Sequence, residues 1–438
     1  MKRPNILYIH SHDTGRYVQP YGFAVPTPNI QALAEEGITF THAFSCAPVC
    51  SPSRAALLTG QVPHSCGMFG LVNRGFELRD RHRHIANVLK SAGYLTVSLG
   101  VHHVVRDPLA CGYEKRLTVD PDRDGAANAA DAAVEFLASP LECPFFLSVG
   151  FRNTHVPFPE VDEKEARYCA PPAPLPDAPE TRKDMAGFKA SARILDEGVG
   201  KVLSALERNG LAENTLVICT TDHGIAFPAM KCNLTDHGIG VMLILRGPGG
   251  FRGGRASDAL LSQIDLFPTI CDLAQIPSPD WLQGKSLLPL VSGRQKEIND
   301  EVHAELNYHA AYEPLRAVRT NRWKYIRRYT DYPHPIMAQI DGCPSKDFMF
   351  RHGYSERVLE AEELYDLVFD PNEARNLCRE PAYSKTLDEM RSRLESWMKR
   401  TDDPLLGGSI PTPKTAVVSD PEEYAHGDIW KRKPKPWT

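Results

Sequence analysis

The stretch NILYIHSHDTGR, residues 5–16, contains the pattern that decides the fold. A short apolar run ends abruptly in polar side chains, and four later stretches repeat the pattern. Short, unbroken apolar runs of this kind are typical of strands that are buried on both faces of a parallel sheet. The four repeats are LTVSLG (95–100), FFLSVGF (145–151), TLVICTT (215–221) and VMLILRG (241–247).

Helical patterns lie between these strands. TPNIQALAEEG (27–37) begins with threonine and proline, and it ends at a glycine, as helices commonly do. HIANVLKSAGY (84–94) and RILDEGVGKVLSALERNG (193–210) show the same spacing. Alternating strands and helices predict an α/β fold with a mostly parallel sheet between helices. We predict that this large domain occupies residues 1–295.

The pattern changes after residue 295. EVHAELNY (301–308), LRAVRTNRWKYIRRY (315–329) and EELYDLVFDP (362–371) have short strand patterns, and a single helix pattern follows at 384–400. These segments predict a smaller C-terminal α+β domain with a short antiparallel sheet at 296–400. Residues 401–438 contain few core-forming positions and are predicted to form an extended tail.

Composition and charge narrow the class of protein. The chain has 438 residues, a hydrophobic content of 42% and a net charge of −5. These values are typical of a soluble globular protein, and without a long basic run we expect no nucleic-acid partner. No apolar run reaches membrane-spanning length, so we expect no membrane partner. The eleven scattered cysteines and an N-terminus without a signal-peptide pattern predict a cytoplasmic protein.

Polar residues at the ends of the predicted strands form a candidate site. Ligands of open α/β sheets bind beyond the carboxyl ends of the strands, which here carry Asp13, His103, His155, Asp222 and His223. One such residue is ordinarily a turn former or a cap, but acids and imidazoles at four strand ends predict a shared site.

These side chains are suited to bind a divalent metal. Carboxylate oxygens and imidazole nitrogens bind metals, so Asp13, Asp222 and His223, with His12, are the candidate ligands. The tripeptide DHG alone is a weak signal, because it recurs at 236–238.

The stretch CAPVCSPSRAALLTG, residues 46–60, adds a different candidate. Pro52 suits the first turn of a helix, with Ser51 as its cap. Cys50 would then lie at the helix N-terminus, where backbone N–H groups favour negative charge, and Arg54 would point back toward it. The alternative is a buried, inert cysteine beside a surface arginine.

CSPSRAALLTG (50–60) resembles the Cys-x-Pro-x-Arg signature of the type I sulfatases, which are formylglycine-dependent members of the alkaline phosphatase superfamily. RPNILYI (3–9), the glycine and histidine at 100 and 103, and TTDHG (220–224) resemble further elements of that family in the same order. GMFGL (67–71), IAFPAMKCNL (225–234) and the stretch 314–326 look most like its heparan N-sulfatase (sulfamidase) branch. The resemblance covers about residues 3–400.

The resemblance implies a role for each matching residue. Cys50 would be converted to formylglycine by a formylglycine-generating enzyme, and the aldehyde hydrate would attack sulfur and later expel sulfate. Arg54 would support this group, His103 would act as the base, and His155 and Lys231 would hold the sulfate and assist the leaving group. The resemblance also implies an alkaline phosphatase/sulfatase-like fold for the large domain.

Three positions depart from the family pattern. The family has Asp-Asp after the first strand and Asp-Asn in the later element, where this sequence has His12-Asp13 and Asp222-His223. Because imidazole replaces oxygen donors, we expect zinc or manganese ahead of calcium. The family's lysine is replaced by valine at 101, and the adjoining His102 becomes a candidate substrate contact.

The sequence therefore predicts a sulfatase that hydrolyses a sulfate ester or sulfamate on a small sulfated carbohydrate, with N- or O-sulfated glucosamine as candidates. Two alternatives stay open. One is a phosphonate monoester hydrolase or phosphodiesterase on the same fold, which the Asp-His pair at 222–223 resembles. The other is a non-catalytic protein that binds sulfated glycans.

Substrate contacts are expected from two further regions. These are the proline-rich stretch 157–180 and ELNYHAAYEPLR (305–316), where Tyr308, His309 and Arg316 are the candidates. The alternative for these three is that they are ordinary strand residues. In the tail, Trp430 and Trp437 lie where no core is predicted, and aromatic residues of this kind are common at interfaces. We therefore expect a homo-oligomer whose tail packs on a body surface.

Overall fold

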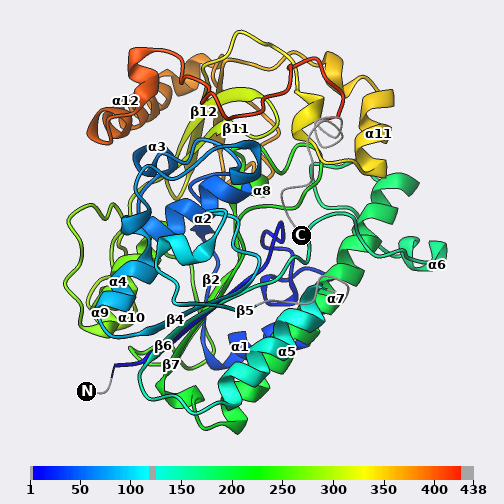
Figure 1. Ribbon diagram of the computed structural model, residues 1–438. Coiled ribbons are helices and arrows are strands. Elements are labelled where there is room, and N and C mark those ends of the chain that lie inside the picture. Colours follow the sequence, from blue (N-terminus) through cyan, green and yellow to red (C-terminus); the bar gives the residue numbers. More distant parts are fainter. Residues whose placement is uncertain (1–2, 118–124, 426–438) are drawn as a thin grey trace.

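A large mixed sheet forms the centre of the computed structural model, which describes residues 3–117 and 125–425 (Figure 1). Its strand order is β5-β4-β6-β1-β7-β8-β2-β9. The strands from β5 to β7 are parallel, whereas β8 runs antiparallel to both neighbours. In chain order the strands are β1 (Asn5–His10), β2 (Ile38–Phe40), β4 (Leu95–Gly100), β5 (Lys115–Leu117), β6 (Phe145–Gly150), β7 (Thr215–Thr220), β8 (Leu243–Arg246) and β9 (Arg255–Ser257).

Burial on both faces explains the unbroken apolar strands. Along β1, Ile6 and Tyr8 pack into the core on one face of the sheet, and Leu7 and Ile9 pack into the core on the other. The first face is covered by α2 (Cys50–Thr59), α4 (Ile85–Ser91) and α9 (Leu266–Ala274). The second face is covered by α1 (Pro28–Glu36), α5 (Gly125–Ala138) and α7 (Pro179–Arg208). The predicted α/β fold with helices on both faces is confirmed.

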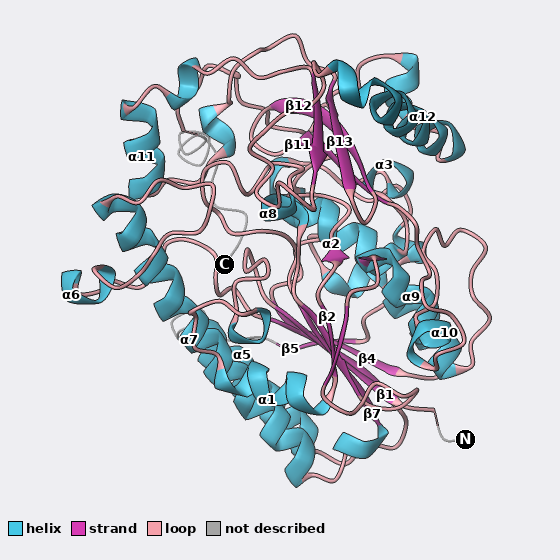
Figure 2. Cartoon of the chain, turned by 180° about the vertical axis from the view of Figure 1, so that it is seen from behind, coloured by secondary structure: helices cyan, strands magenta, loops and turns pink. Residues whose placement is uncertain are grey.

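A smaller antiparallel sheet follows, as predicted, with strand order β11-β12-β13-β14. Figure 2 shows it beyond α2, with α12 on its outer side. Leu394 and Trp397 of α12 pack against this sheet in a shared core with Val318 and Tyr325. The elements are β11 (Val302–Tyr308), β12 (Tyr312–Arg319), β13 (Trp323–Arg328), β14 (Glu362–Asp366) and α12 (Ser384–Arg400).

Short elements complete the described fold. A two-stranded parallel sheet joins β3 (Ala43–Phe44) and β10 (Leu261–Ser262). The short helices are α3 (Pro63–Cys66), α6 (Glu163–Ala166), α8 (Asp236–Ile239), α10 (Leu288–Val291) and α11 (Pro344–Arg351). Among the described helices, none combines the length and apolar character needed to cross a membrane. All eleven cysteines are free thiols.

Segments of the C-terminal part return to the large domain. The N–H of Ser345 in α11 donates to Asp184 Oδ2 of α7 at 2.6 Å. In the tail, the N–H of Val417 donates to the carbonyl of Arg74 at 2.8 Å. The described tail residues thus pack on the body of their own chain. Trp430 and Trp437 lie outside the described residues, and the boundaries at 295 and 400 and the homo-oligomer stay predictions.

A buried charge network ties the small sheet to the rest of the chain. On β12, Arg316 bonds through Nη2 to Asp403 Oδ1 at 3.0 Å and lies 3.2 Å from Glu305 Oε2. Glu305 Oε2 in turn bonds to His64 Nδ1 at 2.7 Å. Burial alone would lower the pKa of Arg316, but the two carboxylates raise it. The guanidinium therefore stays charged and compensates both acids.

Replacing this arginine tests its structural role. Arg316→Ala should lower the free energy of unfolding by about 3–5 kcal/mol, because two buried carboxylates lose their cation. Urea unfolding followed by tryptophan fluorescence measures the change. Arg375→Ala removes an exposed partner of Glu380 and should change the same quantity by less than about 0.5 kcal/mol. An equally small effect of both substitutions would contradict the role.

Candidate active site

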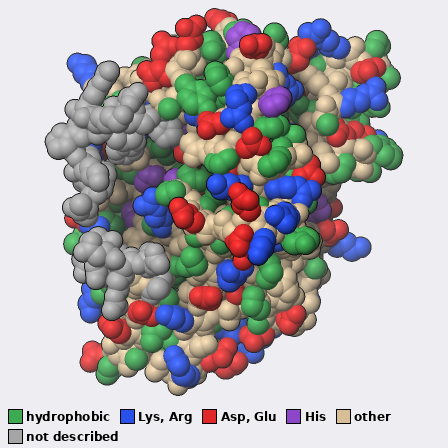
Figure 3. All heavy atoms as spheres, turned by 90° about the vertical axis from the view of Figure 1, so that its right-hand side faces the viewer, with side chains coloured by type: hydrophobic (Ala, Val, Ile, Leu, Met, Phe, Trp, Pro, Cys, Tyr) green, Lys and Arg blue, Asp and Glu red, His purple; other side chains and the backbone are tan. Residues whose placement is uncertain are grey.

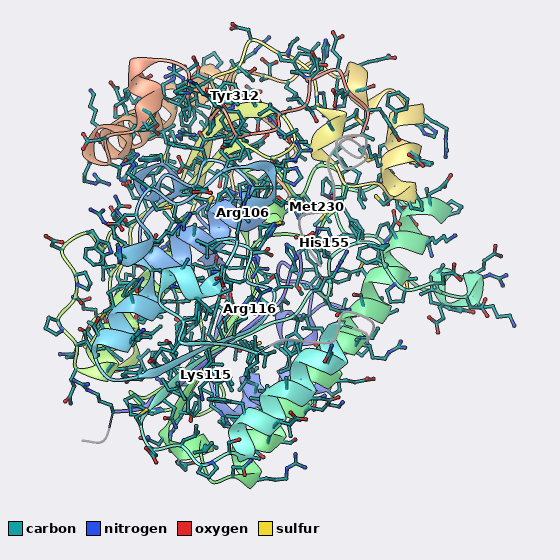
Figure 4. The ribbon with its side chains drawn as sticks, in the orientation of Figure 1. Arg106, Lys115, Arg116, His155, Met230 and Tyr312 are labelled. Atoms are coloured by element: carbon teal, nitrogen blue, oxygen red, sulfur yellow. The ribbon has the colours of Figure 1, made fainter. Side chains whose placement is uncertain are left out.

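A cavity of about 590 Å³ lies at the carboxyl ends of the parallel strands. Figure 3 shows histidine side chains in a hollow at one side of the face it presents, beside basic side chains. Figure 4 places His155 and Met230, which precedes Lys231, between the large and the small sheet. The predicted site residues that line the cavity are His12, Cys50, His102, His103, His155, Lys231 and His309.

Two of the strand-end residues adopt an unusual backbone conformation. Asp13 and His103 each have a φ of 57°, in the left-handed region that side chains other than glycine rarely occupy. The N–H of Asp13 donates to Asp222 Oδ1 at 2.8 Å, which fixes the turn after β1. Such conformations cost free energy and persist where the surroundings impose them. Here they direct an acid and an imidazole toward the same place.

The two oxygens of Asp13 have different neighbours. Oδ2 accepts a hydrogen bond from Lys231 Nζ at 3.0 Å and lies 3.7 Å from His155 Nε2. Oδ1 lies 3.2 Å from His223 Nε2 and 3.9 Å from Cys50 Sγ. The side chain is fully buried, so Lys231 compensates its charge on one side. The other oxygen faces the thiol and the imidazole.

The two oxygens of Asp222 also have different neighbours. Oδ1 accepts from the N–H groups of Asp13 and His223 at 2.8 and 3.0 Å. Oδ2 accepts from Arg54 Nη2 at 2.9 Å and lies 3.3 Å from His12 Nε2. Burial alone would raise the pKa of Asp222, but Arg54 and His223 hold it well below its ordinary value. The carboxylate is therefore ionised.

Cys50 is the first residue of α2 and lies buried in this group, with Sγ 3.4 Å from His223 Nε2. Burial raises the pKa of its thiol well above the ordinary value, and Lys231 opposes this only in part. Cys50 thus lies at the helix N-terminus, as predicted, but burial keeps its thiol protonated. The expected cap is wrong: Val49 precedes the helix without a side-chain cap, and the Ser51 hydroxyl instead accepts from the N–H of Val72.

The side chains fit a divalent cation. His12 Nε2 is buried without a hydrogen-bond partner among the described residues. His12, Asp13, Cys50 and Asp222 each offer a ligand atom within 4.8 Å of the others. His223 Nδ1 bonds to the carbonyl of its neighbour at 3.0 Å, so Nδ1 carries the hydrogen and the Nε2 lone pair faces the carboxylates. Burial lowers the pKa of His12 and His223, which keeps both neutral.

Three further histidines line the cavity. A ring nitrogen of His103 lies within 4.8 Å of both His12 and Cys50, and burial lowers the pKa of His103 to about 3. Its imidazole is therefore neutral, as a base must be. His102 packs with its Nε2 3.6 Å from Cys111 Sγ. His309 also lines the cavity and comes from the segment that follows β11.

Comparison with known proteins identifies the family. The family model described as Sulfatase matches residues 4–276. The chain belongs to the sulfatase family. A second model, described as N-sulphoglucosamine sulphohydrolase, C-terminal, matches residues 230–346. The predicted enzyme class, a hydrolase of sulfate esters or sulfamates, is therefore confirmed.

Several sulfatases resemble the chain over most of its length. The human N-sulphoglucosamine sulphohydrolase is 29% identical over 91% of each chain. An ulvan-active sulfatase of Formosa agariphila is 26% identical over 92% of this chain and 76% of its own. The structure of a 2-O GAG sulfatase superposes with a TM-score of 0.74 at 25% identity, covering 98% of this chain and 100% of the other.

The sulfatase site contains an acid that the sequence did not predict. Asp341 Oδ2 accepts from Lys231 Nζ at 2.7 Å and lines the cavity. It lies in the long connection between β13 and β14, far in the sequence from any strand end of the large sheet, so no motif marks it. Burial alone would lower the pKa of Lys231, but Asp13 and Asp341 raise it well above its ordinary value. The ammonium group is therefore charged.

Two predicted substrate contacts have structural roles instead. The Tyr308 hydroxyl donates to the carbonyl of Ile410 at 2.7 Å, and its ring packs on Phe76. Arg316 is fully buried in the charge network described above. Neither side chain lines the cavity, and of its described lining residues none comes from the stretch 157–180. The strand-residue alternative is the correct one for both side chains.

Asp341 is expected to position the lysine. Asp341→Asn should lower kcat/KM for an aryl sulfate about tenfold, because Lys231 loses one of its two carboxylates and turns toward Asp13. Asp347→Asn changes an exposed acid nearby and should leave kcat/KM within about twofold of wild type. Steady-state kinetics of the two variants provides the test. Wild-type kinetics for Asp341→Asn would rule out the positioning role.

Proposed function

We propose that this sulfatase removes sulfate from N- or O-sulfated glucosamine, through a formylglycine formed at Cys50 and one divalent metal. The observation that carries the proposal is the setting of Cys50. It is buried at the start of α2 beside Asp13 and His223, and two buried cations, Arg54 and Lys231, pair with the acids around it. The name of the human relative, an N-sulphoglucosamine sulphohydrolase, supports the amino sugar.

The acids and imidazoles would hold the metal. Asp13 Oδ1 and Asp222 Oδ2 face the same side as His12 Nε2 and His223 Nε2. A cation bound there would stabilise negative charge on the sulfate oxygens. Formylglycine at position 50 would supply a hydrated aldehyde as the nucleophile.

Arg54 and Lys231 hold positive charge where sulfate would bind. Arg54 Nη2 is fixed by Asp222 Oδ2 and by the carbonyl of Ser11, each at 2.9 Å. Lys231 is fixed between Asp13 and Asp341 and lines the cavity. Because both cations are already oriented, they would stabilise charge on the sulfate without further reorganisation.

Two histidines are suited to move protons. His103 is neutral and close to residue 50, so it would accept a proton there. His155 Nδ1 donates to the carbonyl of Val156 at 2.6 Å, and its side chain is 23% exposed. His155 Nε2 therefore faces the cavity, and contact with solvent would let it protonate the leaving group.

One feature favours a second candidate, a phosphonate monoester hydrolase or phosphodiesterase. This feature is His223, an imidazole among the metal-facing groups, where sulfatases have an amide. The alternative predicts turnover of phosphate diesters by the same residues. An assay that compares sulfated substrates with a phosphate diester therefore distinguishes the two candidate functions.

The substrate assay also tests Cys50. Enzyme co-expressed with a formylglycine-generating enzyme should hydrolyse N-sulfoglucosamine and an aryl sulfate about 100-fold faster than a phosphate diester, and Cys50→Ala should lower kcat by about 10³-fold or more. Cys46→Ala is the control, since Cys46 Sγ contacts Ser262 and does not line the cavity. Faster diester turnover would favour the second candidate, and wild-type kcat in Cys50→Ala would exclude the formylglycine.

Metal analysis tests the ligand set. Protein purified without added metal should contain about one zinc or manganese ion per chain, because neutral imidazoles favour these ions over calcium. His223→Asn should shift the preference toward calcium. His237→Asn is the matched control from the second DHG tripeptide, since His237 Nδ1 bonds to the Tyr17 hydroxyl at 2.9 Å. Stoichiometric calcium in the wild-type protein would contradict this prediction.

A further inference from the structure

More cationic than anionic side chains line the cavity. Among the described residues, one lining side chain is acidic, Asp341. The cationic ones are Arg74, Arg106, Arg116, Arg152 and Lys231. Of these five cations, the sulfate-binding role proposed above uses only the lysine, so the four lining arginines need a separate explanation.

Two of the five cations are engaged within the protein. Lys231 lies between two carboxylates. Arg74 is buried, and its Nη1 donates to two backbone carbonyl oxygens at 3.0 and 3.1 Å. These contacts give Arg74 a structural role between the cavity wall and the tail.

The other three arginines are exposed to the cavity. Arg106, Arg116 and Arg152 are exposed, and within the described residues none of them has an ion pair or a side-chain hydrogen bond. Like charges that line one cavity repel one another and contribute no stability to the fold. A bound anion would remove this repulsion, since a guanidinium group binds sulfate and carboxylate oxygens through paired hydrogen bonds.

The fold places these arginines together on one side of the nucleophile. Arg106 follows β4, Arg116 lies on β5 and Arg152 comes two residues after β6. These three strands are neighbours at one edge of the sheet, whereas Asp13 and Asp222 follow β1 and β7. In Figure 4, Arg106 and Arg116 lie on the same side of His155. The cavity therefore has a metal-facing side and an arginine side.

We propose that Arg106, Arg116 and Arg152 form a second anion subsite, which binds a sulfate or carboxylate other than the one that is cleaved. The proposal rests on the proposed function, since the scissile sulfate must occupy the end beside Cys50. The enzyme would then prefer sugars with two anionic groups over sugars with one. The exposed arginines also attract such substrates over a distance.

Calorimetry on the Cys50→Ala protein tests the subsite by binding alone. The ligands are N-sulfoglucosamine and glucosamine N,6-O-disulfate. A third ligand, N-sulfoglucosamine linked to a hexuronate, distinguishes a carboxylate from a second sulfate. The Cys50→Ala protein is the parent of the further variants. It should bind at least one of the two doubly anionic sugars about tenfold or more tightly than the singly anionic one. Each of R106Q, R116Q and R152Q should reduce this ratio about threefold to tenfold.

The control is R375Q, which removes an exposed arginine outside the cavity and should leave the ratio unchanged. Equal affinity of the parent for all three sugars, or an unchanged ratio in all three cavity variants, would overturn the subsite. Turnover of N-sulfoglucosamine by the formylglycine-containing enzyme is measured separately. That assay tests the proposed function, whereas the affinity ratio tests the subsite alone.

Discussion

Two buried ion pairs, Asp222 with Arg54 and Asp13 with Lys231, determine where the other groups of the site lie. A buried carboxylate without a partner costs several kcal/mol, so each acid holds its cation in place. Asp222 ties the end of β7 to α2, and Asp13 ties the end of β1 to the loop that carries Lys231. Position 50, at the start of α2, is thereby fixed between these strand ends.

The charge balance also explains the contribution of the small domain. Lys231 faces two acids, and the second, Asp341, comes from the connection between β13 and β14. The site is therefore completed only when this connection packs on the large domain. Ser345, close to Asp341 in sequence, bonds to Asp184 of α7 and holds the connection there. The second domain thus orients a cation of the first.

Local patterns in the sequence predicted five of the eight strands of the central sheet, missing the three-residue strands β2, β5 and β9, and they marked most of the site. Strand ends mark Asp13, His103, His155 and Asp222, and a parallel sheet brings such ends together. The same rule would have found Arg152, which comes two residues after β6. Asp341 follows no such rule, because its position depends on how a long connection packs.

For polar residues on strands of the small sheet, it was harder to predict whether the side chain faces the cavity or the core. Tyr308 and Arg316 lie on strands of the small sheet, and a polar side chain there can face either a cavity or a core. The structure turns both inward, where the arginine meets two acids and the tyrosine meets a carbonyl. Only the tertiary partners decide this choice, and these partners are far away in the sequence.

A crystal structure of the enzyme with zinc or manganese and inorganic sulfate would show whether the two ion-paired acids bind the metal. We expect an anomalous peak about 2.0–2.2 Å from oxygens of Asp13 and Asp222, with sulfate between residue 50 and Lys231. His84, His102 and Cys111 form a different group whose ligand atoms lie within 4.8 Å of one another. Metal at that group, with none between Asp13 and Asp222, would contradict the assignment of these two acids as metal ligands.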